Sequence, residues 1–208
     1  NGKIKFFYSN GIEFSVKKNH IDLIQNKKSG KVVFYKTNLD NLKISFKSIV
    51  IKGKAENEAY DLDGCINFIE SKISKIDFSI FLDENSNCND GIHFENTSGD
   101  INSISVYNAP KDAIDSDFSN ISFNEVRVDK TGQGGECIGL KSGKYYIYKA
   151  TLTGCYDTGI SLGENGNLKV DNAEISDSSI GLVSKDSSNL EIKNIRIKDT
   201  ENCLIAYR

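Results

Sequence analysis

An apolar pattern at positions i, i+3 and i+5 constrains this chain more than any other feature, because it returns through most of the sequence. Side chains on a strand alternate with period two, so the three-residue step marks a bend between two short strands. Successive copies lie 27, 28, 22, 24, 23 and 22 residues apart, which indicates structural repeats stacked on one another. The copies are Phe46-Ile49-Ile51, Ile73-Ile76-Phe78, Ile101-Ile104-Val106, Phe123-Val126-Val128, Ile147-Ala150-Leu152, Val170-Ala173-Ile175 and Ile192-Ile195-Ile197.

A second column of apolar residues recurs at a similar spacing and predicts a further short strand in each repeat. Polar turns such as Gly163-Glu164-Asn165-Gly166 separate the columns. Three short strands per unit and no helical period predict an all-β fold, a single-stranded right-handed parallel β-helix of about seven rungs. A β-propeller is excluded because its blades need roughly 40 residues. The second column consists of Ile66, Ile92, Ile114, Ile138, Ile160, Ile180 and Leu204.

Residues 1–38 fit the repeat less well than residues 39–208, which we assign to the parallel β-helix. In the first segment, residues 3–16 predict a hairpin around Ser9-Asn10-Gly11, and residues 31–35 predict another strand. We expect this segment to form an N-terminal β cap, or irregular first rungs, over an end that would otherwise be an exposed sheet edge. The last rung shows no such cover, which favours neighbouring domains of a longer chain as partners.

Composition narrows the function classes. The net charge of −3 argues against nucleic-acid binding, because phosphate contacts require a basic excess. No apolar run reaches the roughly 20 residues of a membrane span, so we expect none. Five cysteines without a C-x-x-C spacing, and only two histidines, argue against a zinc site. We expect the cysteines to be small buried apolar side chains inside the solenoid.

The register of the columns gathers outward side chains of three consecutive repeats on one face. Ile92, Ile114 and Ile138 point inward in this register, and the residues after them point outward. Neighbours lie about 5 Å apart across rungs and about 7 Å apart along a strand, so the outward side chains form one patch. The patch consists of His93, Glu95, Asp115, Asp117 and Lys141.

Three interpretations of this patch remain open. Carboxylates roughly 5–9 Å apart suit glycoside hydrolysis, so Asp115 and Asp117 are candidate catalytic residues, with Glu95 and His93 assisting them. Lys141 would then bind carboxylates of the substrate. The same oxygen-rich patch suits Ca²⁺, a hard cation. The third interpretation is a solvated face with ordinary ion pairs.

An acidic column lies beside the patch, at Asp90, Asp112 and Glu136. Like charges stacked directly on one another repel unless something compensates them. A bound cation, with Ca²⁺ as the candidate, would compensate these three residues as ligands. Solvation at a turn is the alternative.

From Asp115-Ser116-Asp117-Phe118-Ser119 onward the chain resembles a bacterial family of parallel β-helix proteins with a pectate-lyase-like solenoid. Successive rungs of that family read D-x-D-F-S, G-D-K-G-I-S-x-G-E and S-K-D-S-S, and the resemblance covers residues 62–208. Two rungs depart from the pattern. One has become Glu136-Cys137-Ile138-Gly139-Leu140-Lys141, and the other reads Tyr156-Asp157-Thr158 in place of G-D-K.

The resemblance implies a module associated with cell-surface or extracellular polysaccharide, acting in binding or as a structural element. Glu164 and Lys185 match the family's turns, and we expect them to bind substrate together with Lys141. The alternative is a carbohydrate-active enzyme, a polysaccharide lyase, glycoside hydrolase or epimerase, that uses the face of Asp115 and Asp117. An extracellular or cell-surface location is favoured, and no organic cofactor is implied.

Overall fold

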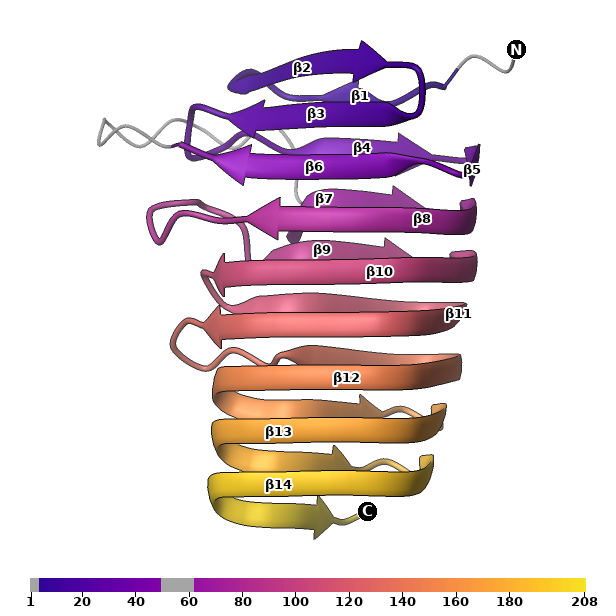
Figure 1. The fold of residues 1–208 in the computed structure, drawn as a ribbon, viewed down its shortest axis with the longest axis vertical. Helices are drawn as coiled ribbons and strands as arrows, with labels where there is room; N and C mark the ends of the chain where they lie inside the picture. Colours follow the sequence, from indigo (N-terminus) through magenta and orange to yellow (C-terminus); the bar gives the residue numbers. More distant parts are fainter. Residues whose placement is uncertain (1–3, 50–61) are drawn as a thin grey trace.

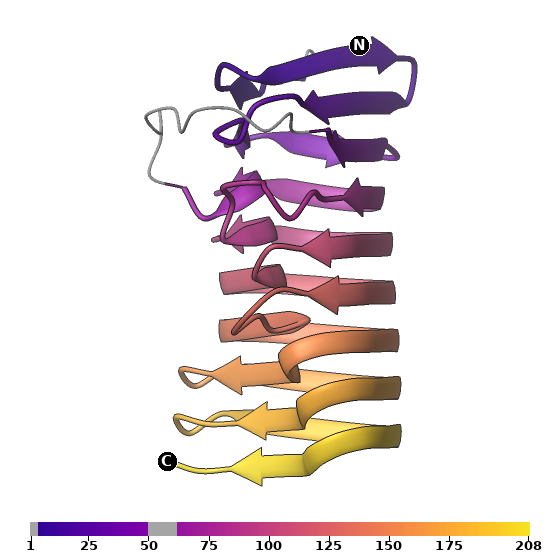
Figure 2. The ribbon, with the colours of Figure 1, turned by 90° about the vertical axis from the view of Figure 1, so that its left-hand side faces the viewer.

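The computed structural model describes residues 4–49 and 62–208, which form an all-β solenoid of about eight turns with no helix (Figure 1). Fourteen strands join into one sheet, and most of them pair in parallel with strands of the turns before and after. The turns stack from one end of the molecule to the other, and Figure 2 shows the stack from a second side. The predicted fold class is therefore confirmed. None of the described residues forms a helix long and apolar enough to cross a membrane.

The last four strands are the longest, with 18 to 26 residues each, because each bends around at least one corner and so forms parts of two walls of the solenoid. In chain order they are β1 (Phe7–Tyr8), β2 (Ile12–Lys17), β3 (His20–Gln25), β4 (Val32–Tyr35), β5 (Asn38–Asp40), β6 (Lys43–Ser48), β7 (Gly64–Ile69), β8 (Lys72–Phe81), β9 (Asp90–Glu95), β10 (Ser98–Ala109), β11 (Asp112–Thr131), β12 (Ile138–Gly163), β13 (Asn167–Ser184) and β14 (Asn189–Ala206).

The N-terminal end is closed by antiparallel strands. β1 pairs antiparallel with β4, and β2 pairs antiparallel with β3. The predicted hairpin around Ser9-Asn10-Gly11 is therefore wrong, since β1 and β2 lie against different partners. β3 and β4 already pair in parallel with β6 and β7, so parallel stacking begins at His20. The strand expected at residues 31–35 is present as β4.

The i, i+3, i+5 register is confirmed for the last five copies, in which Ile101, Phe123, Ile147, Val170 and Ile192 are successive pairing partners.

The two earlier copies are out of register. A bulge in β10 pairs Ile101 with Ile76, and Ile104 with Phe78, where the sequence pattern had aligned Ile101 with Ile73. The pattern had aligned Ile73 with Phe46, but Ile73 pairs with Leu39 in the structure. Ile51, the last residue of the first copy, lies outside the described residues.

The second column is confirmed in pairing from Ile66 through Ile92 and Ile114 to Ile138. It then fails at Ile180, because Leu182 is the residue that pairs with both Ile160 and Leu204. The register shifts by one residue between Cys155 and Thr158, and the residue that pairs with Ile160 lies two positions beyond the predicted Ile180. A slip of two keeps the same face of the strand, which explains why the alternation alone did not reveal it.

The core is a continuous apolar column inside the coil. Phe34 stacks on Phe68 with ring centroids 4.6 Å apart, and Phe68 stacks on Phe94 at 5.5 Å. The column continues through Ser116 and Leu140, which are fully buried at the same position of the following turns.

Four of the five cysteines are buried as predicted, but they are not free apolar side chains. Cys65 is bonded to Cys88 and Cys137 to Cys155, while Cys203 is a free, exposed thiol. The sequence pattern missed both disulfides because each joins segments that only the coiling brings together.

Candidate functional site

The predicted patch exists, and pairing of β9, β11 and β12 positions it. Asp115 pairs with His93 on one side and Gly139 on the other, and Asp117 pairs in the same way with Glu95 and Lys141. The intervening residues Ile114 and Ser116 point into the core, so these side chains all leave the same wall.

His93 lies at the centre of a charged cluster. Its Nδ1 is 3.3 Å from an Asp90 carboxylate oxygen and 3.2 Å from one of Asp115, and its Nε2 is 3.9 Å from Asp117. Burial lowers the pKa of His93, but hydrogen bonds to Asp115 and Asp90 outweigh it and raise the pKa to about 10. The imidazole is therefore a cation at neutral pH. We call His93, Asp90, Asp115, Asp117 and Lys141 the His93 cluster.

Lys141 supplies the second cation of this cluster. Its Nζ lies 3.4 Å from Asp115 and 3.5 Å from Asp117. Burial alone would raise the pKa of Asp115, but His93 and Lys141 together hold it below its usual range. For Asp117, burial and the neighbouring Asp115 charge raise the pKa. Glu95 lies beside Asp117 in register, with no ion pair to any described residue.

The acidic column is only partly assembled as the sequence suggested. Asp90 and Asp112 are direct pairing partners, and Asp112 Oδ1 accepts a hydrogen bond of 2.8 Å from the backbone N–H of Glu136. Burial is the main cause that raises the pKa of Asp90 to about 6 and that of Glu136 to about 7; the pKa of Asp112 is also raised. Protonation therefore relieves part of the repulsion that the stacked carboxylates would suffer.

Ligand atoms suited to a cation gather around His93 rather than along the acidic column. Among the described residues, Asp63, Asp90 and His93 form one such group, and His93, Asp115 and Asp117 the other. Both groups require a nitrogen lone pair of His93, whose ring carries both protons at neutral pH. A metal ion would first have to displace a proton, and we assign no metal to either group. The cation role expected for Asp90, Asp112 and Glu136 stays a prediction.

A cavity of about 210 Å³ opens next to the His93 cluster and spans four turns of the solenoid. We call it the lysine cavity, because three lysines from different turns border it. Three carboxyl groups share its lining with them. Its lining residues are Lys111, Asp112, Asp115, Gly134, Glu136, Leu140, Lys141, Ser161, Gly163 and Lys185.

Gly139 lies directly against two of those carboxyl groups. A Cβ at this position would lie 2.8 Å from Glu136 Oε2 and 2.9 Å from Asp115 Oδ1, closer than such atoms approach one another. A side chain at position 139 would therefore require one of these two carboxyl groups to move.

Of the three residues predicted to bind substrate, the structure brings two together and places the third elsewhere. Lys141 and Lys185 both border the lysine cavity. Glu164 does not; it is exposed in a turn, where its backbone carbonyl accepts a hydrogen bond of 2.8 Å from the Ser142 hydroxyl. Sequence reasoning missed Lys111 and Ser161. Following the outward column of Asp115 and Gly139 one turn further would have found Ser161.

Ser119, the last residue of the D-x-D-F-S motif, serves the fold rather than the site. It is buried at a corner, where its hydroxyl donates to the carbonyl of Asp117 (2.8 Å) and accepts from the N–H of Thr97 (3.0 Å). Phe118 before it turns the corner with a φ of 52°.

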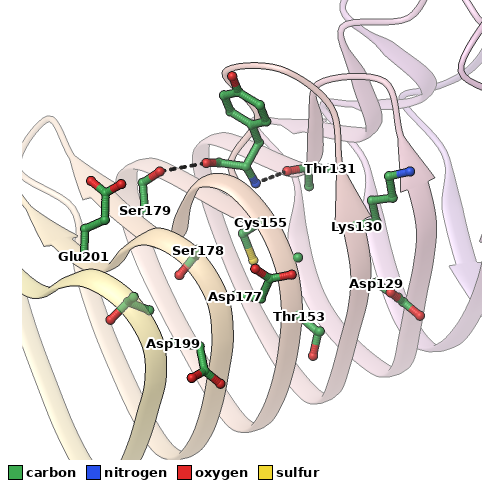
Figure 3. Close-up of a pocket in the computed structure, with 13 residues that line it drawn as sticks. Asp129, Lys130, Thr131, Thr153, Cys155, Asp177, Ser178, Ser179, Asp199 and Glu201 are labelled. Carbon is green, nitrogen blue, oxygen red and sulfur yellow. Dashed lines mark hydrogen bonds between the residues drawn. The ribbon is translucent and has the colours of Figure 1, made fainter.

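A larger hollow of about 760 Å³, which we call the corner groove, follows a different corner of the last turns (Figure 3). Positive φ values at Lys130, Gly154, Asp177 and Asp199 produce that corner turn after turn. Its carboxylates, such as Asp177 and Asp199, are exposed to solvent. The groove is therefore a consequence of the coiling and carries no buried charge, in contrast to the lysine cavity.

Comparisons of the chain with protein-family models, with curated proteins and with solved structures find no match. The likeness to a β-helix family therefore stays a resemblance.

Proposed function

We propose that the lysine cavity binds an anionic polysaccharide, and that the protein is a polysaccharide-associated module. The observation that carries this proposal is the convergence of Lys111, Lys141 and Lys185 from separate turns on one cavity lined with carboxyl groups. Ammonium groups pair with the carboxylates of an acidic sugar, while carboxylates accept hydrogen bonds from sugar hydroxyl groups. An acidic sugar presents both kinds of group.

The charge distribution favours a sugar acid over a denser polyanion. Lys185 makes no ion pair with any residue in the described parts of the chain, so its ammonium group is available to a ligand. Lys141 is already paired with Asp115 and Asp117. Nucleic acid carries one charge per roughly 1.7 Å and needs a basic excess, which a lining of three lysines and three carboxyl groups does not provide.

Two further features support an extracellular polymer as the ligand. The solenoid presents an extended wall of stacked strands, which suits a long chain more than a small molecule. The two disulfides, Cys65–Cys88 and Cys137–Cys155, are typical of proteins in oxidising compartments, where extracellular polysaccharides occur.

Isothermal titration with polygalacturonate and alginate as anionic polymers, and dextran as a neutral polymer, tests the proposal. We expect the anionic polymers to bind and dextran not to bind. Lys185→Gln should weaken binding about tenfold, the loss of roughly one charge-assisted contact. Added salt should weaken the interaction further.

Lys144→Gln is the matched control, because Lys144 is exposed on another wall of the turn that carries Lys141. Equal binding of dextran and the uronate polymers would contradict the proposal. So would a loss of affinity in Lys144→Gln as large as that in Lys185→Gln.

A further inference from the structure

The last turn of the solenoid leaves one strand edge and one end of the apolar core uncovered (Figure 1). Among the strands of the described residues, β14 pairs with β13 alone. Leu182 in β13 is 1% exposed, whereas Leu204, its pairing partner in β14, is 58% exposed. Ile195 is 40% exposed, although its partner Ala173 is only 4% exposed. This end of the core is therefore covered on one side only.

The uncovered end is apolar, although end repeats of solenoid proteins usually present a polar outer face. The two preceding turns carry Ala150 and Ala173 at the position of Ile195, so β14 adds apolar surface where the core is least covered. Its free edge also presents unpaired N–H and C=O groups, which are a template for pairing with another strand. An apolar end beside an unpaired edge indicates that a further strand packs here.

β14 matches a second copy of itself in antiparallel pairing. Its first wall bends near the middle, where the core-facing positions step from Ile192 to Ile195. The register that sets Ile192 opposite Ile195 of the second copy also sets Leu190 opposite Ile197 of the second copy, so all four side chains face one joined core. A shift of one or two residues would set a core-facing side chain opposite an outward one. The bend therefore fixes a single register.

The charges on the outer face of β14 match the same register. It sets Glu191 opposite Arg196 of the second copy, and two-fold symmetry makes this pair twice. Arg196 makes no ion pair with any residue in the described parts of the chain, so its guanidinium group is available. Opposite charges across antiparallel strands attract, whereas like charges directly opposite repel. A shift of two residues in one direction would instead set Lys193 opposite Arg196.

The other end of the solenoid does not fit this edge. Its free strands are β1 and β2, with two and six residues, and neither carries the bend of β14. They can match only a part of an 18-residue strand that turns a corner. The geometry therefore favours a pair of copies joined at their last turns over a head-to-tail stack.

We propose that two copies of this protein associate end to end through β14, around a two-fold axis at the bend, so that one apolar core runs through both. Such a pair closes on itself, whereas head-to-tail contacts would continue into a fibre. No residue of β14 lines the lysine cavity, so the association does not depend on the proposed function.

Sedimentation velocity from about 1 to 200 µM protein tests the inference, with melting temperatures to confirm that each variant is folded. We expect a reversible equilibrium between monomer and dimer, with no larger species. Arg196→Glu should raise the Kd of the dimer about tenfold or more, because two attractive pairs become repulsive. The double variant Glu191→Arg/Arg196→Glu exchanges the charges and should restore the dimer.

Arg127→Glu is the matched control. Arg127 is exposed on the same wall at the position of Arg196, three turns earlier, and makes no ion pair within the described residues. The substitution changes the charge of the protein equally but lies away from the free edge. We expect it to leave the Kd of the dimer unchanged.

A spin label on Cys203 distinguishes the two ways of joining copies. Cys203 is exposed and is the one free thiol among the five cysteines, so it can be labelled alone. In the proposed dimer the last turns are neighbours, and the two labels should lie within about 25 Å, the length of about eight strand residues. A head-to-tail stack would separate them by about eight turns, roughly 40 Å.

A protein that stays monomeric over the whole concentration range would overturn this inference. So would larger species that grow with concentration, or a label separation of about 40 Å or more. Equal weakening of the dimer by Arg127→Glu and Arg196→Glu, or a charge exchange that does not restore association, would also overturn it.

Discussion

Among single residues, the two buried carboxyl groups Asp115 and Glu136 have pKa values shifted in opposite directions. Asp115 keeps its charge because His93 and Lys141 lie within 3.4 Å of it. Glu136 has no such partner at that distance among the described residues, and its pKa rises to about 7. Near neutral pH an ionised Asp115 and a partly protonated Glu136 therefore line the same cavity.

Glu136 should make the protein less stable as pH rises. Its pKa in the folded state is about 7, against an ordinary value of 4.5, so the folded state binds the proton more tightly. Its share of the free energy of unfolding is therefore highest below about pH 4.5 and is lost as pH rises towards 7. At pH 8 we expect Glu136→Gln to be more stable than wild type by up to about 3 kcal/mol. Chemical denaturation at pH 5 and pH 8 measures this, and an equal gain at both pH values would contradict it.

His93 should stabilise the fold at neutral pH. His93→Gln leaves Asp90 buried without its cation and Asp115 with Lys141 alone, which costs about 3 to 5 kcal/mol. The pKa of His93 is raised, so its stabilisation is complete below about pH 6.5 and disappears as pH rises through about 10. His20→Gln is the control, because the His20 side chain is 41% exposed and should change stability by less than about 0.5 kcal/mol. Equal effects of the two substitutions in urea unfolding at pH 7 would refute the role of His93.

Calcium should not be required for stability. His93 and Lys141 already contact all three carboxyl groups of the His93 cluster and offset two of their charges, so we expect the same melting temperature in EDTA and in millimolar Ca²⁺. A rise in Ca²⁺ that Asp90→Asn abolishes would instead support the cation role that the acidic column first suggested.

Among the strands, the i, i+3, i+5 pattern predicted the pairing register correctly from Ile101 onward, and incorrectly for the two copies before it. Period-two alternation identifies which face of a strand is buried, so the outward patch of His93, Asp115 and Lys141 followed directly. Alternation cannot detect an error of two residues. The partners of Ile104 and Ile160 each lie two residues beyond the predicted ones. The cavity was beyond prediction because it is lined by side chains of turns as far apart in the chain as those of Lys111 and Lys185.

The Cys137–Cys155 disulfide should stabilise the turn that carries Glu136. It closes a segment with a sequence separation of 18, for which the lost freedom of the unfolded chain corresponds to about 3 kcal/mol. We expect the double variant Cys137→Ala/Cys155→Ala to unfold at lower urea concentration than wild type. Cys203→Ala is the control, since Cys203 is free and exposed. An unchanged midpoint in the double variant would contradict this expectation.

In the whole molecule, the solenoid stacks equivalent residues of successive repeats directly on one another. Lys111, Lys141 and Lys185 are far apart in the chain, yet all border one cavity because the turns between them stack in parallel. We propose that an anionic polysaccharide binds in this cavity, and titration of ¹⁵N-labelled protein with trigalacturonate, followed by NMR, measures where it binds. We expect the largest shift changes on amides around Glu136, Gly139 and Lys185. Changes centred on the corner groove at Asp177 and Asp199, or none at all, would contradict this proposal.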